Sequence, residues 1–307
     1  MAQDVKKNSK AQSKTPLVSV VMSVYNGEKY LREAIESILN QTLVDFEFII
    51  INDGSSDDTL KIIKSYSDPR IVLISRKNKG LVVSLNEGIQ KSRGKYIARM
   101  DADDVSMAKR LERQVRFLEL NPKAVLCGTS FIEIDEVGNR IQDIDVPTTN
   151  DLICQELTAR CTFAHGSTLF LRSSAISAGL YRAKDYPAED YALWLRLSRL
   201  GEVGNLSNKL FQYRIVSQSI SRTNNAEQIK KAKSVQEKAR SIYPFLLWRQ
   251  PIIWAKLSNE KRGRLYINHH YAIMIDAFSR SDRKLRYVKI KLAFLLWRLW
   301  NRMFNEK

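Results

Sequence analysis

The 307-residue chain lacks any apolar run long enough to cross a membrane as a helix, which takes roughly 18–20 consecutive apolar residues. Its first residues, Met1 to Thr15, are polar and lysine-bearing and lack the apolar core of a secretory signal. These absences argue against a membrane span and a cleaved leader. We expect residues 1–15 to form a disordered tail.

Cysteine is also scarce, since the chain has only Cys127, Cys154 and Cys161. Their odd number and their spacing match no zinc-binding pattern. We therefore expect buried, reduced thiols. Reduced thiols are typical of the cytoplasm, so the sequence predicts a cytoplasmic protein.

Acidic residues are few beside basic ones, and the formal net charge is +17. Such a charge is compatible with a nucleic-acid or anionic-membrane partner. Its distribution is uneven: from Thr223 onward there are 19 Lys/Arg and 6 Asp/Glu, a net of +13, which leaves 31 against 27 and a net of +4 before it. The first two-thirds therefore have an ordinary enzyme-like surface.

Apolar, β-branched runs alternate with helix-spaced runs over the first hundred residues. Strands of this kind separated by helices predict an α/β fold with a mostly parallel sheet covered on both faces. The predicted strands are Val18 to Tyr25, Phe46 to Ile51, Ile71 to Ser75 and Tyr96 to Met100, with helices after Asn26-Gly27, after Asp53-Gly54 and over Gly80 to Lys91.

Polar residues follow three of these strands, and ligands of such sheets bind beyond the carboxyl ends of the strands. The polar clusters are Tyr25-Asn26, Asp53 and Asp101-Ala102-Asp103-Asp104, which we expect to converge on one crevice. A pair of carboxylates such as Asp101 and Asp103 suits Mg²⁺ or Mn²⁺, although a solvated acidic loop would look the same.

Two further acidic positions allow more than one role. Asp53 could form a turn before the next helix, or could accept hydrogen bonds from a base or a ribose. Glu189 and Asp190 open a predicted helix, where they could stabilise its N-terminus or act as a general base toward an acceptor hydroxyl.

The chain changes character after Asp104. A helix is predicted over Arg110 to Leu120, a hairpin at Val137-Gly138-Asn139, and a short strand after His165-Gly166. His165 could be structural, supply a third metal contact, or line an acceptor pocket. We divide the chain into a tail (1–15), a main domain (16–222) with a nucleotide half (about 16–104) and an acceptor half (about 105–222), and a helical, basic, amphipathic region (223–307).

These motifs together resemble one family. Residues 18–59, from VSVVMSVYNGEKYLREAIESILNQT to FIIINDGSSDDT, resemble the start of the family 2 inverting glycosyltransferases of bacterial polysaccharide and glycolipid synthesis, which have the GT-A fold. Residues 78–104 (NKGLVVSLNEGIQKSRGKYIARMDADD), 189–196 (EDYALWLR) and 212–214 (QYR) resemble later parts of the same domain. The resemblance covers about residues 16–222.

The resemblance implies roles for individual residues. Asp103 is expected to bind the metal and Asp101 to contact the ribose or the metal. Asp190 is expected to be the catalytic base, with Glu189 beside it, and the anomeric configuration to be inverted. The base and ribose of the donor are expected to contact Tyr25, Asn26, Glu28 and Asp53.

Two positions depart from the family pattern. Many relatives carry an arginine where Leu85 stands, so the phosphate contact is either missing or supplied by Lys79. The segment from Ser106 to Arg110 lacks a proline that many relatives have. Neither departure removes an expected catalytic group.

The end of the chain predicts a basic amphipathic helix from Leu285 to Phe304. Its apolar residues follow a 3-and-4 spacing, and Trp297 and Trp300 add apolar surface beside a stripe of Lys and Arg. This helix either packs on the main domain or lies on an anionic membrane surface. We favour the membrane, and therefore a peripheral position on the inner face of the cell membrane.

The sequence thus predicts a metal-dependent glycosyltransferase that moves a sugar from a nucleoside diphosphate donor, a UDP-sugar, to a saccharide or lipid-linked acceptor. A sugar nucleotidyltransferase would also use paired carboxylates and a metal, but it would release pyrophosphate. A nucleic-acid-binding protein would account for the charge of the last segment but not for the acidic centres before it. We expect no nucleic-acid partner.

Overall fold

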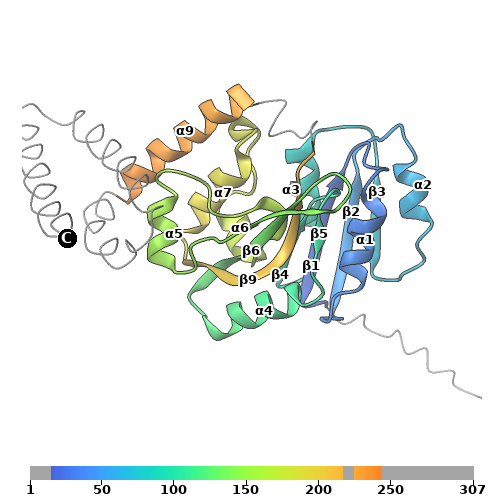
Figure 1. The fold of residues 1–307 in the computed structure, drawn as a ribbon, viewed down its shortest axis with the longest axis horizontal. Coiled ribbons are helices and arrows are strands. Elements are labelled where there is room, and N and C mark those ends of the chain that lie inside the picture. Colours follow the sequence, from blue (N-terminus) through green and yellow to red (C-terminus); the bar gives the residue numbers. More distant parts are fainter. Residues whose placement is uncertain (1–14, 217–224, 244–307) are drawn as a thin grey trace, which may run out of the picture. The chain divides into compact units, whose positions relative to one another are not determined.

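The computed structural model describes residues 15–216 and 225–243. Strands and helices alternate over the first hundred residues, close to the predicted bounds (Figure 1). Strands β2 and β4 are buried along their whole length, as their largely apolar sequences favour. The elements are β1 (Val18–Val24), α1 (Leu31–Leu39), β2 (Phe46–Asn52), α2 (Thr59–Lys64), β3 (Ile71–Ser75), α3 (Leu81–Lys91) and β4 (Tyr96–Met100).

The second half of the domain mixes short helices with strands. The predicted helix after Asp104 and the predicted hairpin are both present, with Gly138 at φ 93° in the turn. The elements are β5 (Val105–Ser106), α4 (Arg110–Leu120), β6 (Ala124–Ile134), β7 (Arg140–Ile144), α5 (Asn150–Glu156), η1 (His165–Ser167), β8 (Leu169–Leu171), α6 (Arg172–Ser177), η2 (Ala183–Asp185), α7 (Glu189–Leu197), β9 (Glu202–Arg214) and α9 (Asn225–Ile242).

All strands of the described residues belong to one sheet, in the order β3-β2-β1-β4-β8-β6-β9-β5, with β7 paired to β6. The strands β3, β2, β1 and β4 are parallel, whereas β8 runs antiparallel to both β4 and β6. Since β9 is parallel to β6, it runs in the same sense as β4. The ends of β1, β2, β4 and β9 and the start of β8 therefore lie at one edge of the sheet.

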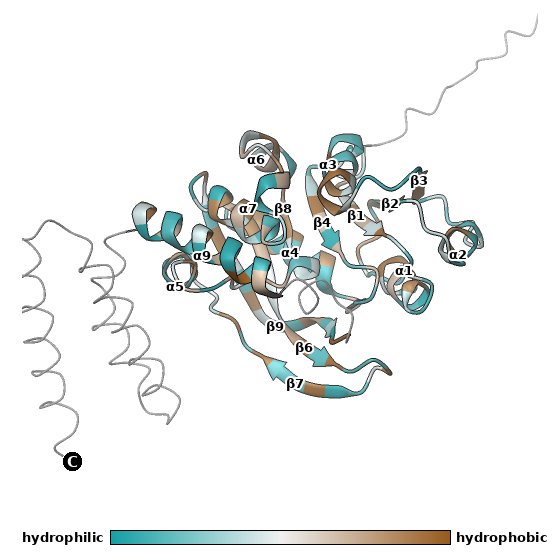
Figure 2. Ribbon diagram, turned by 90° about the horizontal axis from the view of Figure 1, so that it is seen from above, coloured by the Kyte–Doolittle hydropathy of each residue, from teal (hydrophilic) through white to brown (hydrophobic). Residues whose placement is uncertain are grey.

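The core lies between the sheet and its covering helices. Apolar side chains of α1 and of β1, β2 and β4 form its centre, and α3 buries Val82, Leu85 and Ile89. Helix α3 packs against β1 and β2, and Figure 2 shows brown, hydrophobic stretches on α3 and β1. This packing holds the strand ends, and hence the loops that follow them, in fixed positions.

Helix α9 packs against α7 and belongs to the same compact unit as the sheet. Its Val235 and Ala239 are buried, and Gln236 and Arg240 donate hydrogen bonds to the carbonyls of Ala159 and Thr158. The predicted tail before Thr15 and the predicted basic helix from Leu285 to Phe304 lie outside the described residues. In the described part of the chain, no helix has the length and apolar character needed to span a bilayer.

Candidate active site

The loops that follow β1 and β2 are held together by hydrogen bonds. The Asn26 side-chain oxygen accepts from the Ser56 backbone N–H (2.9 Å), and the Glu28 carboxylate accepts from the Asp58 N–H (2.8 Å). Tyr25 lies in the first of these loops with an exposed ring. The structure thus brings Tyr25, Asn26 and Glu28 beside the loop that begins at Asp53.

Asp53 fixes the turn that follows β3. It is 2% exposed, and its Oδ1 accepts hydrogen bonds from the Lys79 N–H (2.8 Å) and from Arg76, while Oδ2 accepts from the Gly80 N–H (2.9 Å). A carboxylate has about four acceptor positions, so three bonds leave one for a ligand. The predicted turn role of Asp53 is therefore present, and a ligand contact remains compatible with it.

The two positions discussed for the donor phosphate differ from each other. Leu85 is completely buried in α3, so that face of the helix brings no charge to the site. Lys79 has an exposed side chain in the turn that Asp53 holds. Arg76, which the sequence patterns did not single out, contacts Asp53, Glu87 (2.7 Å) and Ser84 (3.0 Å) and adds a guanidinium group there.

The acidic motif follows β4 directly. Asp101 accepts a hydrogen bond from Arg99 Nη2 at 2.5 Å. Burial and the charge of Asp101 raise the pKa of Asp103 to about 6. Asp104 is 2% exposed, and burial raises its pKa well above the usual range. Its Oδ1 accepts from the Arg214 N–H (2.7 Å), while its Oδ2 is buried without a hydrogen-bond partner in the described chain.

Gly166 lies directly against this motif. A Cβ atom built there would lie 2.8 Å from Asp101 Oδ2, 3.2 Å from Asp104 Oδ2 and 2.6 Å from the Phe211 ring, so a side chain has no room. The two carboxylate oxygens are therefore close to one another beside the Gly166 backbone, which the antiparallel pairing of β8 with β4 brings next to Asp101. Neighbouring carboxylate oxygens are ligands that suit Mg²⁺ or Mn²⁺.

The protein alone does not complete a metal site. Within residues 15–216 and 225–243, no three His, Cys, Asp or Glu side chains are grouped closely enough to hold an ion. Ions such as Mg²⁺ commonly take one or two protein carboxylates and complete their shell with substrate phosphates and water. The donor set of Asp101, Asp103 and Asp104 is compatible with that arrangement.

His165 lies beside the acidic motif, in η1, but is engaged by aromatic residues. Its Nε2 is 2.9 Å from the Tyr181 hydroxyl, and its ring packs against Tyr181 and Trp194. Burial holds the pKa of the imidazole well below its usual range, so the ring is neutral. His165 is therefore in a position where it could line a pocket. Its contact with a metal stays a prediction.

Glu189 and Asp190 form the second acidic centre, at the start of α7. Burial and the charge of Asp190 raise the pKa of Glu189 to about 8, and its Oε2 is buried without a partner in the described residues. Burial and the charge of Asp101 raise the pKa of Asp190, and the hydrogen bond from the Tyr191 N–H lowers it. The resulting pKa is about 6. The charge of Asp101 contributes to the rise of both pKa values, so Asp101 lies near the second acidic centre.

Three buried arginines surround these acids, and the sequence patterns had assigned none of them an individual role. Arg99 lies on β4, is 2% exposed and contacts Asp101. Its positive charge offsets part of the rise in the pKa of Glu189 and of Asp190. Arg110 is completely buried and donates to the carbonyls of Arg99 and Gly166. The third is Arg214, at the end of β9. A lone arginine within the apolar run YIARM was a usable signal, since a buried charge requires a partner.

Comparison with known proteins decides the family. A family model described as glycosyl transferase family 2 matches residues 19–180, more than half of the chain. This chain is a family 2 glycosyltransferase. The resemblance noted in the sequence is confirmed, and the protein is an enzyme of the transferase class.

Its curated relatives carry related names. An uncharacterized glycosyltransferase of Haemophilus influenzae is 38% identical over 247 residues, which is 74% of either chain. The putative glycosyltransferase EpsE of Bacillus subtilis is 37% identical and is matched over 83% of its length by 74% of this chain. The O-antigen biosynthesis glycosyltransferase WbnJ of Escherichia coli is 35% identical and is matched over 92% of its length by 75% of this chain.

Solved structures share the fold of this glycosyltransferase. S. aureus TarS 1-349 in complex with UDP-GlcNAc aligns with a TM-score of 0.59 at 13% identity, covering 94% of this chain and 91% of that one. The mannosyltransferase PcManGT from Pyrobaculum calidifontis, in complex with GDP-Man and Mn²⁺, aligns with a TM-score of 0.54 at 14% identity over 96% and 89%. The predicted GT-A fold is confirmed, with antiparallel strands joining the parallel ones in its second half.

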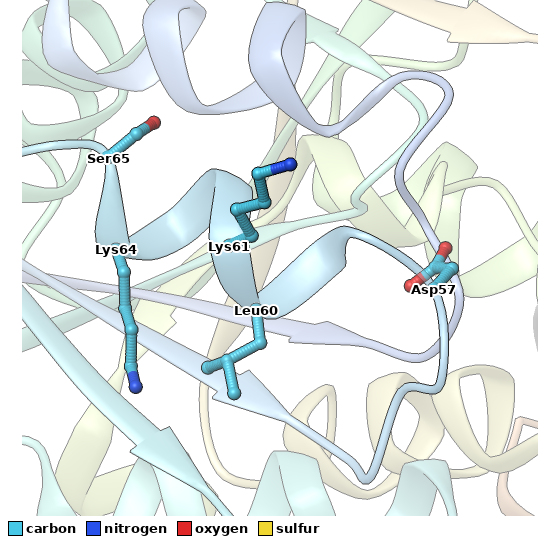
Figure 3. Close-up of a pocket in the computed structure, with 5 residues that line it drawn as sticks. All are labelled: Asp57, Leu60, Lys61, Lys64 and Ser65. Carbon is cyan, nitrogen blue, oxygen red and sulfur yellow. The ribbon is translucent and has the colours of Figure 1, made fainter.

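A hollow of about 480 Å³ lies on the outer side of α2 and is separate from the acidic centres. It is lined by Asp57, Leu60, Lys61, Lys64 and Ser65. Figure 3 shows that the side chains of Lys61 and Lys64 point in different directions. Since these charges do not converge, the hollow offers the glycosyltransferase no built anion site.

Proposed function

We propose that this glycosyltransferase moves a sugar, with inversion, from a UDP-sugar to an acceptor hydroxyl with the help of Mn²⁺ or Mg²⁺. The observation that carries the proposal is the pair of separate acidic centres at one edge of the sheet. Asp101 and Asp103 follow β4, while Glu189 and Asp190 begin α7. An inverting transfer needs charge neutralisation on the leaving diphosphate and a base on the opposite face of the sugar.

The nucleoside is assigned to the loops after β1 and β2. Tyr25 offers an exposed ring for stacking, and Asp53 keeps an acceptor position for a base or a ribose hydroxyl. Asn26 and Glu28 hold these loops together and border the same space. The exposed side chain of Lys79 supplies positive charge there for the donor, whereas the charge of Arg76 is balanced by Asp53 and Glu87. UDP-GlcNAc bound to the structural neighbour TarS favours a uridine donor.

Asp103 and Asp101 are the proposed ligands of the divalent ion, with the unpartnered Oδ2 of Asp104 beside them. When bound, the ion supplies positive charge to the diphosphate as the glycosidic bond breaks. The Mn²⁺ in the complex of the structural neighbour PcManGT supports this proposal. His165 is kept as a further candidate contact.

Asp190 is the proposed catalytic base. Its carboxylate removes the proton from the acceptor hydroxyl while that oxygen attacks the anomeric carbon and the diphosphate leaves from the opposite face. A pKa near 6 leaves Asp190 ionised at neutral pH while retaining basicity, which suits general-base catalysis. Glu189, whose pKa is raised to about 8, stays protonated beside it and can donate a hydrogen bond to the acceptor.

The acceptor is proposed to be a saccharide or lipid-linked polysaccharide precursor. The relatives AmsE and WbnJ are named for amylovoran and O-antigen biosynthesis, respectively, which supports this class. The sequence after Thr223, with its net charge of +13, is proposed to hold the enzyme on the cytoplasmic face of an anionic membrane. Co-sedimentation of the full chain with anionic liposomes at low salt tests this, and its absence would exclude membrane binding.

A donor screen tests the activity. The full-length protein is incubated with a panel of nucleotide sugars in Mn²⁺ or in EDTA, and the released nucleoside diphosphate is measured. We expect release from a UDP-sugar in Mn²⁺ and little in EDTA. Release of pyrophosphate from a nucleoside triphosphate and a sugar phosphate would instead identify a nucleotidyltransferase.

A further inference from the structure

Arg214 is a buried side chain that contacts both the acidic motif and two other segments of the domain. It ends β9 and is 3% exposed, yet it is charged, so its guanidinium must find partners within the protein. Its Nε donates to the Asp103 carbonyl (2.8 Å), and its Nη1 donates to the carbonyls of Asp135 (3.2 Å) and Glu136 (3.4 Å). Its Nη2 donates to Glu33 Oε2 at 2.5 Å.

Two hydrogen bonds join Arg214 to the acidic motif, one from its backbone and one from its side chain. The Arg214 backbone N–H donates to the Asp104 carboxylate (2.7 Å), while the Arg214 side chain donates to the backbone carbonyl of Asp103. The next residues extend the contact, since Val105 and Ser106 pair with Gln212 and Phe211. The loop that carries Asp103 therefore cannot shift without breaking bonds to the end of β9.

The same guanidinium reaches the helix that follows the first donor loop. Its carbon Cζ lies 4.6 Å from the centre of the Tyr30 ring, and Glu33, its carboxylate partner, is on the first turn of α1. Tyr30 and Lys29 in turn contact Glu136 in the turn between β6 and β7. Three segments far apart in the sequence thus meet at one side chain.

We propose that Arg214 is a positioning residue that fixes Asp103 and Asp104 in the geometry needed to hold the divalent ion against the nucleotide. This role rests on the proposed metal use, and it acts through other residues because the guanidinium is buried and donates to four acceptors within the protein. Through its contact with Glu33, Arg214 also holds the loop of Asp103 and Asp104 in place relative to α1. Loss of Arg214 therefore weakens the binding that depends on the ion more than the binding that does not.

The test is a calorimetric titration of UDP into the full-length protein, in Mn²⁺ and in EDTA. In Arg214→Lys, which keeps the charge but loses the branched set of donors, we expect the UDP affinity in Mn²⁺ to fall about tenfold, the scale of one lost charged hydrogen bond. We expect the affinity in EDTA to change by less than about twofold. Arg140→Lys is the matched control, because Arg140 is an exposed arginine of β7 paired with Asp143, and it should match the wild type.

A second variant covers the event that Arg214→Lys does not fold. Glu33 is 53% exposed, so Glu33→Gln should fold, and we expect its UDP affinity in Mn²⁺ to fall about threefold because only one of the contacts is weakened. Folding is checked by the thermal unfolding midpoint.

Three results would overturn the inference. The first is an unchanged Mn²⁺ response in a folded Arg214→Lys, or in Glu33→Gln if the lysine variant is unfolded. The second is an equal loss in Mn²⁺ and EDTA, which would show a general structural role. The third is a wild-type protein that binds UDP no better in Mn²⁺ than in EDTA, which refutes the proposed metal use itself and is seen before any variant is made.

Discussion

The proposed donor side of the site (the loops after β1 and β2) and the proposed acceptor side (the start of α7) differ in how far their polar groups are satisfied. On the donor side, Asn26, Glu28 and Asp53 each accept hydrogen bonds from neighbouring backbone N–H groups. On the acceptor side, Glu189 Oε2 and Trp194 Nε1 are buried without partners in the described residues. Since buried polar groups are rarely left unpaired, the acceptor side is the part that a ligand or water completes.

This difference separates two tasks. A donor side built by the protein's own bonds is preorganised, so it binds without paying to order its loops. On the proposed acceptor side, the unpartnered oxygen of Glu189 is available for a contact with the substrate. The acidic motif lies between the two, with Asp104 bonded on one oxygen and open on the other.

The largest expected effect is the loss of the ion-binding carboxylate. Asp103→Ala should lower transfer by about 10³-fold or more, because an ion that neutralises the leaving group contributes several kcal/mol. Transfer is measured as nucleoside diphosphate released in Mn²⁺, with thermal unfolding as the control for folding. Wild-type turnover in this variant would show that the donor side works without Asp103.

The next effect belongs to the acceptor side. Asp190→Asn should lower kcat by about 10²-fold while the KM for the donor stays nearly constant, since the amide keeps the shape but cannot accept a proton. Asp151→Asn is a suitable control, because Asp151 is an exposed acid in the first turn of α5. A rise in donor KM as large as the fall in kcat would move Asp190 to the nucleotide.

The acid limb of the pH profile gives a smaller effect. Only the ionised form of Asp190 accepts a proton, and its pKa is raised from the usual 3.8 to about 6. The kcat should therefore rise about tenfold from pH 5 to a plateau near pH 7, and the rise should vanish in Asp190→Asn. A flat profile down to pH 5 would show that no acid with a raised pKa limits turnover.

The smallest effect probes the boundary between the two sides. In Gly166→Ala, the added Cβ would meet the Phe211 ring at 2.6 Å and Asp101 Oδ2 at 2.8 Å. Overpacking of this kind lowers the free energy of unfolding by about 1–3 kcal/mol, which denaturant titration measures. Mn²⁺-dependent UDP binding should weaken as well. Unchanged stability and binding would mean that the two carboxylates have room to move.

The first half of the fold was predictable because its signals are local. The strands β1 to β4 are mostly apolar, and the apolar residues of the helices between them have regular spacing. The observed bounds of β1 and β3 therefore differ from those predicted by at most one residue. The expectation that polar residues gather at one edge of the sheet followed from the rule for parallel strand ends. The order β8-β6-β9 depends on pairings between distant segments, which no local pattern encodes.

The acidic residues of the candidate site were predictable from the sequence, whereas the roles of its arginines were not. Asp101, Asp103, Glu189 and Asp190 stand at element ends, where a carboxylate draws attention. Arg214 contacts Asp103, Asp135 and Glu33 only because β9 returns beside β5 and β6. Its importance is a property of the tertiary structure, although the motif that contains it had been noted in the sequence.

The most direct test of two separate acidic centres is one titration series, in which UDP is added in Mn²⁺ to the wild type, Asp103→Ala and Asp190→Asn. Binding belongs to the first centre and turnover to the second, so Asp190→Asn should bind UDP as tightly as the wild type. Asp103→Ala should bind it only as weakly as the wild type does in EDTA. An equal loss of UDP affinity in both variants would contradict this division of roles, because it would show that both acidic centres bind the nucleotide.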